Sequence, residues 1–271
     1  MTAIPLEDTV ADIVAKAMRG LQLNEAQVAA SAGVTTSAIA HLCDGHCDDA
    51  TVRAVAPVLR LGAAALLAIG REAWHPQPLS VAGLACFNTP YADMAVNSYL
   101  IFDPGNGEAV AFDSGADCSG MLEFLHQEKL TLKSILLTHT HIDHIVDLGR
   151  LKQAGGTPVF VSERETFPAA EPFAAGREFQ CGRLRIATRL TWGHSRGGIT
   201  YVIDGLDRPL AVVGDAMFAG SMGGGGVSYA DALRTNREQI LTLPASTILC
   251  PGHGPLTTVG EEWLHNPFFS A

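Results

Sequence analysis

Four side chains that bind metal ions well are concentrated in one short stretch of the sequence. Residues 136–144 read LLTHTHIDH, which places His139, His141, Asp143 and His144 within six positions. On a β-strand, His139 and His141 would point to the same face because side chains alternate, and a turn into a helix would bring Asp143 and His144 to the same space. Imidazole and carboxylate groups are ligands of zinc, iron and manganese. The stretch therefore predicts a metal site at the end of a buried strand.

The motif THTHIDH resembles the THxHxDH signature of the metallo-β-lactamase superfamily. Three further pieces follow in that family's order, namely His194 in TWGHSRGG, Asp215 in VVGDAMF and His253 in CPGHGPLTT. The resemblance covers about residues 79–271. It implies an α/β fold, the αββα four-layer sandwich, and a site for two divalent metal ions. Zinc is the expected metal, and iron and manganese are the alternatives.

Carried over residue by residue, the resemblance assigns three ligands to each ion and one ligand between them. The first ion would be held by His139, His141 and His194, the second by Asp143, His144 and His253, and the bridge would be Asp215. Two ions can share a hydroxide that attacks a carbonyl, so the implied chemistry is hydrolysis through a metal-bound hydroxide. Asp143 and Asp215 are the carboxylates expected to take part in catalysis. Asp113 stands in a turn similar to the family's Asp-x-Gly and is a candidate support beneath the metals; a simple turn is the alternative.

The C-terminal third narrows the expected substrate. GDAMFAGSMGG and CPGHGPLTTVGEEWLHNPFF are similar to the glyoxalase II branch, which hydrolyses glutathione thioesters. The resemblance implies a small-molecule substrate of that kind. Two departures stand against it: Gly223-Gly224 replaces the usual basic residue, and no segment matches the helical C-terminal domain that holds glutathione in longer members. Arg196 is a candidate donor to a substrate carboxylate, and a solvated loop arginine is the alternative.

Other functions stay open on the same residues. A persulfide dioxygenase would use a single Fe(II) held by His139, His194 and Asp215. A hydrolase of another ester, a lactone or a phosphodiester would use the whole set. The least favoured function is a ligand-sensing, DNA-binding regulator. The PGHGPLTT tail favours hydrolysis over the dioxygenase.

Residues 1–75 predict a small all-α domain that precedes the hydrolase domain of residues 76–271. The run LNEAQVAASAGVTTSAIAHLCDG resembles a helix-turn-helix, and Asn24 with Gln27 forms the sequence pattern of a capping box. The third helix, TTSAIAHL, contains no Arg, Lys, Asn or Gln, and the segment to His75 carries five basic against eight acidic residues. Because phosphate contacts dominate DNA affinity, we expect no nucleic-acid binding. Homo-oligomer contacts, or a cover over the enzyme site, are the expected roles.

The pattern changes from helices to short strands after the prolines Pro76 and Pro78. The expected strands include residues 81–87, 95–102, 109–112, 135–138, 199–203 and 210–213, and the expected helices include residues 230–241. The formal net charge of −10 also disfavours a nucleic-acid surface. The sequence shows no signal peptide, no apolar stretch long enough to cross a membrane and no paired cysteine framework, so we expect a cytoplasmic protein with reduced thiols.

Overall fold

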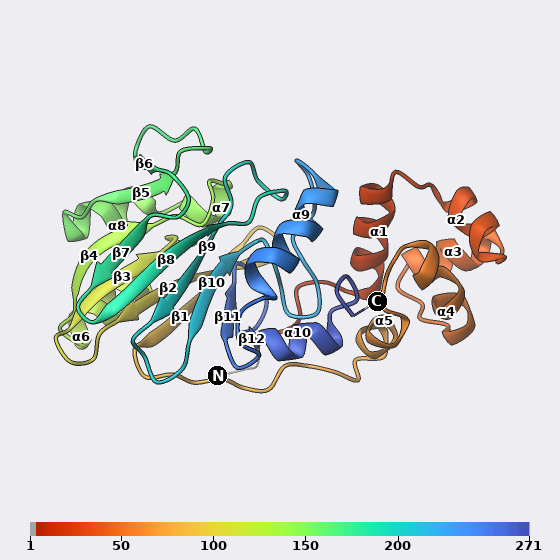
Figure 1. The fold of residues 1–271 in the computed structure, drawn as a ribbon, viewed down its shortest axis with the longest axis horizontal. Helices are drawn as coiled ribbons and strands as arrows, with labels where there is room; N and C mark the ends of the chain where they lie inside the picture. The colour runs from red at the N-terminus through yellow and green to blue at the C-terminus, as the bar shows by residue number, and fades with distance from the viewer. Residues whose placement is uncertain (1–3, 271) are drawn as a thin grey trace.

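The computed structural model describes residues 4–270 and shows two mixed β-sheets packed face to face, with helices on both outer faces (Figure 1). The first sheet has the order β1 (Leu84–Tyr91), β2 (Met94–Phe102), β3 (Glu108–Phe112), β4 (Thr131–Leu136), β5 (Val159–Ser162) and β6 (Glu171–Phe173). The second has the order β12 (Thr257–Thr258), β11 (Ile248–Pro251), β10 (Leu210–Gly214), β9 (Ile199–Asp204), β8 (Leu184–Leu190) and β7 (Glu178–Cys181). The predicted αββα sandwich is confirmed.

The space between the sheets is filled by side chains from both of them. Phe112 on β3 meets Tyr201 on β9 edge to face, with ring centroids 5.2 Å apart, and Leu136 and Val212 belong to the same apolar cluster. The central strands β3, β4 and β5 pair in parallel, as do β10 and β11. Strands buried on both faces have continuous apolar sequences. β10 fits this pattern, because its sequence LAVVG is apolar and every residue of it is buried.

The outer faces of the sheets are covered by amphipathic helices. The helices that follow the N-terminal segment are α6 (Ser119–Gln127), α7 (Ile142–Ile145), α8 (Leu148–Gly155), α9 (Tyr229–Thr235), a π-helix (Asn236–Ile240) and α10 (Val259–His265). Met121 of α6 and Leu151 of α8 are buried in the cluster that covers the first sheet. The single helix expected over residues 230–241 is instead α9 followed by the π-helix, where the side chain of Asn236 turns inward and donates to the Ala216 carbonyl at 2.5 Å.

Five helices form the N-terminal segment, and side-chain caps fix where several of them begin. Their bounds are α1 (Val10–Leu21), α2 (Glu25–Ala32), α3 (Thr36–Cys43), α4 (Asp49–Val58) and α5 (Ala63–Gly70). Asn24 and Gln27 form the capping box expected from the sequence, since each side chain accepts from the other's backbone amide at 2.9 Å. Thr9 caps α1 in the same way. Caps of this kind satisfy amides that have no partner inside the helix.

Helices α1 and α5 lie beside α9 and α10, and α2, α3 and α4 lie farther from the sheets (Figure 1). Their apolar side chains form one continuous cluster with those of β10, α9, the π-helix and the residues around Phe268. The Gly62 amide donates to the Pro267 carbonyl at 2.7 Å, and Trp74 stacks on His265 at 4.8 Å. The division into domains of residues 1–75 and 76–271 stays a prediction. Within residues 4–270, every helix is too short or too polar to span a bilayer.

Candidate metal centre

The first candidate ligands follow β4, at the edge of the first sheet. β4 ends at Leu136, so His139 and His141 lie on the loop that follows the strand and not on the strand, as the alternation argument proposed. The chain leaves the sheet because the Thr138 amide donates to the Asp113 carboxylate at 2.8 Å, and a side chain thus replaces the next strand partner. The short helix α7 then carries Asp143 and His144, as expected.

The structure brings all seven candidate ligands together from four separate segments of the chain, one of which includes the short helix α7. The ligand atoms form two groups whose members lie within 4.8 Å of one another, the first being His139, His141, His194 and Asp215 and the second being Asp143, His144 and His253. Asp215 lies between the groups. Its carboxylate oxygens are 3.4 Å from His194 Nε2, 3.2 Å from His144 Nε2 and 3.5 Å from His253 Nε2.

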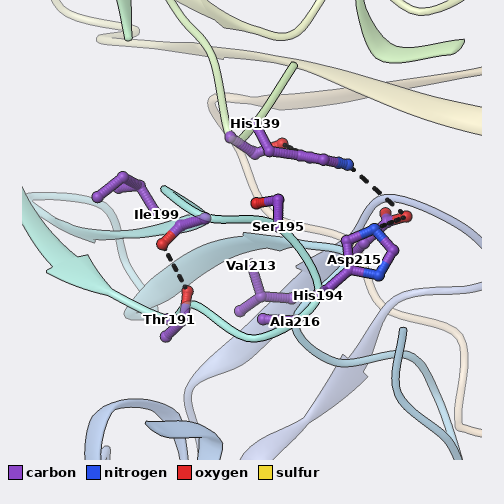
Figure 2. A pocket seen from close by; sticks show the side chains of 10 residues that line it. His139, Thr191, His194, Ser195, Ile199, Val213, Asp215 and Ala216 are labelled. Carbon is purple, nitrogen blue, oxygen red and sulfur yellow. Dashed lines mark hydrogen bonds and ion pairs between the residues drawn. The ribbon is translucent and has the colours of Figure 1, made fainter. Parts of the chain in front are cut away.

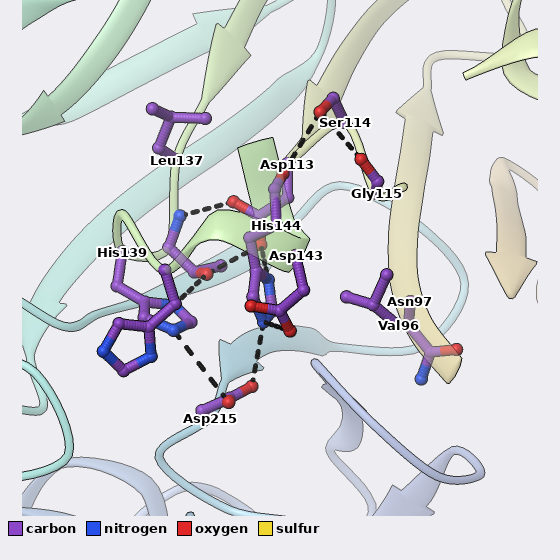
Figure 3. Close-up of polar contacts among 12 residues, drawn as sticks. Val96, Asn97, Asp113, Ser114, Gly115, Leu137, His139, Asp143, His144 and Asp215 are labelled. Carbon is purple, nitrogen blue, oxygen red and sulfur yellow. Dashed lines mark hydrogen bonds and ion pairs between the residues drawn. The ribbon is translucent and has the colours of Figure 1, made fainter. Parts of the chain in front are cut away.

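Asp113 supports two of these histidines from behind (Figure 3). His144 Nδ1 donates to its carboxylate at 2.8 Å, and the Thr138 hydroxyl donates to it at 2.7 Å. Since the hydroxyl has given its proton to Asp113, its oxygen accepts from His139 Nδ1, 3.0 Å away. Asp113 is buried and has a φ of 59°, a backbone conformation that residues other than glycine rarely adopt. The carboxylate of Asp113 therefore orients the His144 ring directly and the His139 ring through the Thr138 hydroxyl.

Backbone carbonyls orient two further histidines in the same sense. His194 Nδ1 lies 2.9 Å from the Gly224 carbonyl, and His253 Nδ1 lies 2.8 Å from the Ala95 carbonyl. A carbonyl can only accept, so each Nδ1 carries a proton and each Nε2 is the ring atom that faces the centre. His141 differs, because it brings Nδ1 to within 2.9 Å of His194 Nε2.

The donor set fits a cation. His139 Nε2, His144 Nε2 and Asp215 Oδ1 are buried and have no hydrogen-bond partner within the described part of the chain. Buried polar atoms without a partner cost free energy and call for an explanation such as an ion. Imidazole nitrogens and carboxylate oxygens at this spacing are the ligands of zinc, iron and manganese alike, so the donor set leaves the choice among these metals open.

The charges of the centre are coupled. Burial disfavours the charged form of His144, but the carboxylates of Asp215 and Asp113 outweigh it and raise its pKa to about 10. For His253, burial is outweighed by hydrogen bonds to Asp143 and Asp215, and the pKa is raised to about 11. The same imidazoles hold the pKa of Asp215 well below its usual range despite burial. A divalent cation bound here would replace protons on the imidazoles.

Two supporting residues, Glu165 and Asn97, were not predicted from the sequence, and a third, Gly252, is one of the glycines that flank the candidate ligands. Glu165 joins two ligand loops, since its carboxylate accepts from the Thr140 hydroxyl at 2.7 Å and from the Gly197 amide at 2.8 Å. Asn97 donates to the carbonyls of Pro251 and Gly254, on either side of His253, at 3.0 and 2.7 Å. Gly252 allows close approach, because a Cβ there would lie 2.1 Å from Asp215 Oδ1. Of the two missed residues, only Asn97 carried a signal, as a polar residue within the apolar strand MAVNSYLIF.

The small pocket between His139 and His194 is not large enough for a substrate (Figure 2). Its volume is about 10 Å³, which is room for roughly one water molecule. Its lining includes Ser195 and Val213. Arg196, the candidate for substrate binding, is exposed and makes no side-chain hydrogen bond or ion pair with residues 4–270. A substrate must therefore reach the ligands from the solvent, to which Arg196 is also exposed.

The loop after Asp215 is held by a buried carboxyl group that should titrate. Burial raises the pKa of Glu262 from 4.5 to about 8, although it accepts from the Thr257 hydroxyl, the Asn266 amide and the Gly220 amide; the neighbouring Glu261 adds to the rise. Between pH 4.5 and 8 the folded protein thus binds more protons than the unfolded chain, so this group's contribution to stability falls as pH rises.

Glu262→Gln should remove this dependence, because a glutamine side chain can donate to Thr257 and accept from Gly220 as the protonated acid does. We expect the variant to match wild type near pH 5 and to exceed it in melting temperature at pH 8, measured by thermal unfolding followed by circular dichroism. A difference in melting temperature that does not change with pH would contradict the assignment.

The comparisons with known proteins concern the part of the chain that holds these ligands. The model of the metallo-beta-lactamase superfamily matches residues 91–253, a range that includes every candidate ligand. A probable metallo-hydrolase, YqgX of Bacillus subtilis, is 28% identical over 205 residues, which cover 67% of this chain and 95% of that protein. A hydroxyacylglutathione hydrolase of Halorhodospira halophila is 31% identical over 181 residues, which cover 65% of this chain and 68% of that protein.

Solved structures show the same fold. The BLEG-1 B3 metallo-beta-lactamase superposes with a TM-score of 0.60 at 29% identity, covering 69% of this chain and all of that one. ETHE1 from Myxococcus xanthus superposes with a TM-score of 0.60 at 26% identity, covering 68% of this chain and 83% of that one.

Proposed function

Because the chain belongs to the metallo-beta-lactamase superfamily, we propose that it is a metal-dependent hydrolase whose substrates are thioesters. The observation that carries the proposal is the position of Asp215, whose carboxylate faces His194 on one side and His144 and His253 on the other. Similarity to the hydroxyacylglutathione hydrolase supports the thioester class. The names of other relatives, such as the probable metallo-hydrolase of Bacillus subtilis, support hydrolysis in general.

In this proposal one set of residues binds the metal ions and a second set orients the ligand side chains. One ion would be held by His139, His141 and His194, the second by Asp143, His144 and His253, with Asp215 shared. When bound, a pair of divalent ions supplies a nucleophile from water at neutral pH and polarises a carbonyl. Asp113, the Gly224 carbonyl and the Ala95 carbonyl keep four imidazoles in the required tautomer. A thiolate is a good leaving group, so the chain needs no strong general acid.

The test combines metal analysis with a substrate panel. Purified protein is analysed for zinc, iron and manganese, and its turnover is measured on thioester, lactone and phosphodiester substrates. We expect two equivalents of metal per chain and a preference for thioesters. One equivalent of iron with oxygen consumption on a persulfide would instead establish the dioxygenase. Turnover of lactones or phosphodiesters alone would keep the hydrolase and exclude the thioester class.

Arg196→Ala should affect substrate binding only. If Arg196 reaches a substrate carboxylate, its loss should raise KM by roughly tenfold, the order expected for one charge-assisted hydrogen bond, and leave kcat little changed, as for uniform binding. The measurement is steady-state kinetics on the preferred thioester. Arg53→Ala, at an exposed position of α4, is the matched control. A fall in kcat equal to the fall in kcat/KM would contradict a role confined to binding.

A further inference from the structure

The loop from Ala216 to Gly223 is a thin layer between the candidate ligands and the N-terminal helices. On its inner side, the Gly223 amide donates to the Asp215 carbonyl at 3.1 Å. Gly223 also lies against a second ligand, because a Cβ on it would be 2.0 Å from that carbonyl and 2.8 Å from His194 Nδ1. A displacement of Gly223 would therefore move Asp215 and His194 together.

On its outer side, the loop is held by helix α1. Lys16 Nζ donates to the Met222 carbonyl at 2.9 Å and forms an ion pair with Asp8. The Asp8 carboxylate also accepts from the Ser221 hydroxyl. The Lys16 and Asp8 side chains are only 14% and 7% exposed. Water therefore competes little for these contacts, which join residues about 200 positions apart in the sequence.

Lys16 also reaches the second group of candidate ligands through an aromatic ring. Its ammonium lies 5.1 Å from the centroid of the Phe218 ring, within the range of a cation–π interaction. The Phe218 ring meets the His253 ring edge to face, with centroids 5.5 Å apart. One side chain of α1 thus contacts both Met222, which precedes the Gly223 that lies against His194, and Phe218, which packs against His253.

The other side chains that hold this loop bond to positions other than Met222, so the Met222 carbonyl is bonded by Lys16. Asn236 holds the Ala216 carbonyl, Glu262 holds the Gly220 amide and Asn266 donates to the Ser221 carbonyl at 2.7 Å. Within residues 4–270, Lys16 is the one hydrogen-bond donor to the Met222 carbonyl. An apolar residue could fill this position without the cost of desolvating a charge. The cation therefore points to a need to fix this carbonyl, beyond simple packing.

We propose that Lys16 is a positioning residue of the metal centre, through which helix α1 fixes Met222 and Gly223 and thereby the ligands Asp215 and His194. The inference rests on the proposed function, because it takes these residues to be ligands. It gives the N-terminal helices a part in the enzyme that the rest of the family fold does not supply, since the family match begins at residue 91.

The test measures metal affinity directly. Lys16→Met keeps an unbranched side chain that lacks only the terminal amino group and removes the donor; Lys16→Arg keeps the charge; Arg19→Met, at an exposed position of the same helix, is the control. Dissociation constants for zinc are measured on the apoprotein by competition with a chromophoric chelator, beside melting temperatures and kinetics. We expect Lys16→Met to weaken binding by roughly 10–100-fold, as for residues that orient ligands, Lys16→Arg to restore most of the loss, and Arg19→Met to match wild type.

A second variant separates the lost contact from the unpaired carboxylate that Lys16→Met leaves behind. The double variant Asp8→Asn with Lys16→Met removes both charges, so it should fold more stably than Lys16→Met and still bind zinc more weakly than wild type. A lower melting temperature with unchanged zinc affinity in both variants would overturn the inference and make Lys16 a purely structural residue. Wild-type protein that binds zinc but hydrolyses no thioester would refute the proposed function alone, because the affinity comparison does not depend on turnover.

Discussion

Asp215→Ala should remove both metal binding and hydrolysis. Asp215 is the carboxylate that approaches both groups of candidate ligands, 3.4 Å from His194 Nε2 and 3.2 Å from His144 Nε2. Without it, four buried or partly buried imidazoles would face one another around the site with Asp143 as the remaining carboxylate. We therefore expect the turnover to fall by well over the roughly 10–100-fold typical of residues that only orient a ligand. Elemental analysis and thioester kinetics on the purified variant measure both effects.

The control for this variant is Asp207→Ala, which removes an exposed aspartate on the turn before β10. It should keep wild-type metal content and turnover. Asp215→Asn keeps the size of the side chain and loses the charge, so it should fold well and still fail to hold two ions. If Asp215→Ala retained full metal content and wild-type turnover, the two-ion site would be wrong and the resemblance would be one of fold without chemistry.

The candidate ligands could be predicted from the sequence because each is marked locally. His139 follows an apolar strand within a dense motif, and Asp215 directly follows the apolar strand β10. Glycines accompany His194 and His253 where the chain must turn closely. These signals do not depend on the rest of the fold. The motif order then allowed residues from four segments to be assigned to one site, and the structure places their ligand atoms within two compact groups.

The supports could not be predicted in the same way, because their partners are distant in sequence and ordinary in type. Glu165 is a surface-type residue in the run VSERE, and nothing near it indicates that it joins Thr140 to Gly197. Lys16 reads as the polar face of an amphipathic helix, although its ammonium bonds the Met222 carbonyl. Such contacts are set by the packing of α1 against α9 and the loop from Ala216 to Gly223, which no local pattern specifies.

The same distinction holds for the secondary structure. The capping box of Asn24 and Gln27 marks the start of α2 in the sequence, and the structure has the helix begin at Glu25. The strands β6 and β7 were missed, because EPF and EFQC lack an apolar run and are largely exposed at the sheet edges. The strand expected over residues 135–138 begins earlier and ends earlier, since Asp113 takes the amide of Thr138.

Residues 1–75 are predicted from the sequence to form a separate helical domain, and removing them tests how independent the two parts are. Deletion of this segment should prevent the remainder from folding stably. Met217, Met222 and Phe268 are at most 1% exposed and belong to the cluster that α1–α5 complete. Exposing three such side chains would cost about 1.5–3 kcal/mol each, which approaches the roughly 5–15 kcal/mol by which whole domains are stable. The yield of soluble protein and its thermal unfolding measure the result.

Point changes on the exposed side of the segment should be harmless by the same argument. Ser37→Ala, on the exposed face of α3, should keep wild-type stability and activity, and it controls for general sensitivity of the segment. An independent bundle predicts the opposite outcome for the deletion, because the remaining chain would then melt at the wild-type temperature and hydrolyse thioesters at the wild-type rate. Since the Gly62 amide bonds the Pro267 carbonyl and Trp74 stacks on His265, the deletion also releases the C-terminal residues that follow α10. We therefore expect the loss of stability to include β10, α9 and the residues that follow α10.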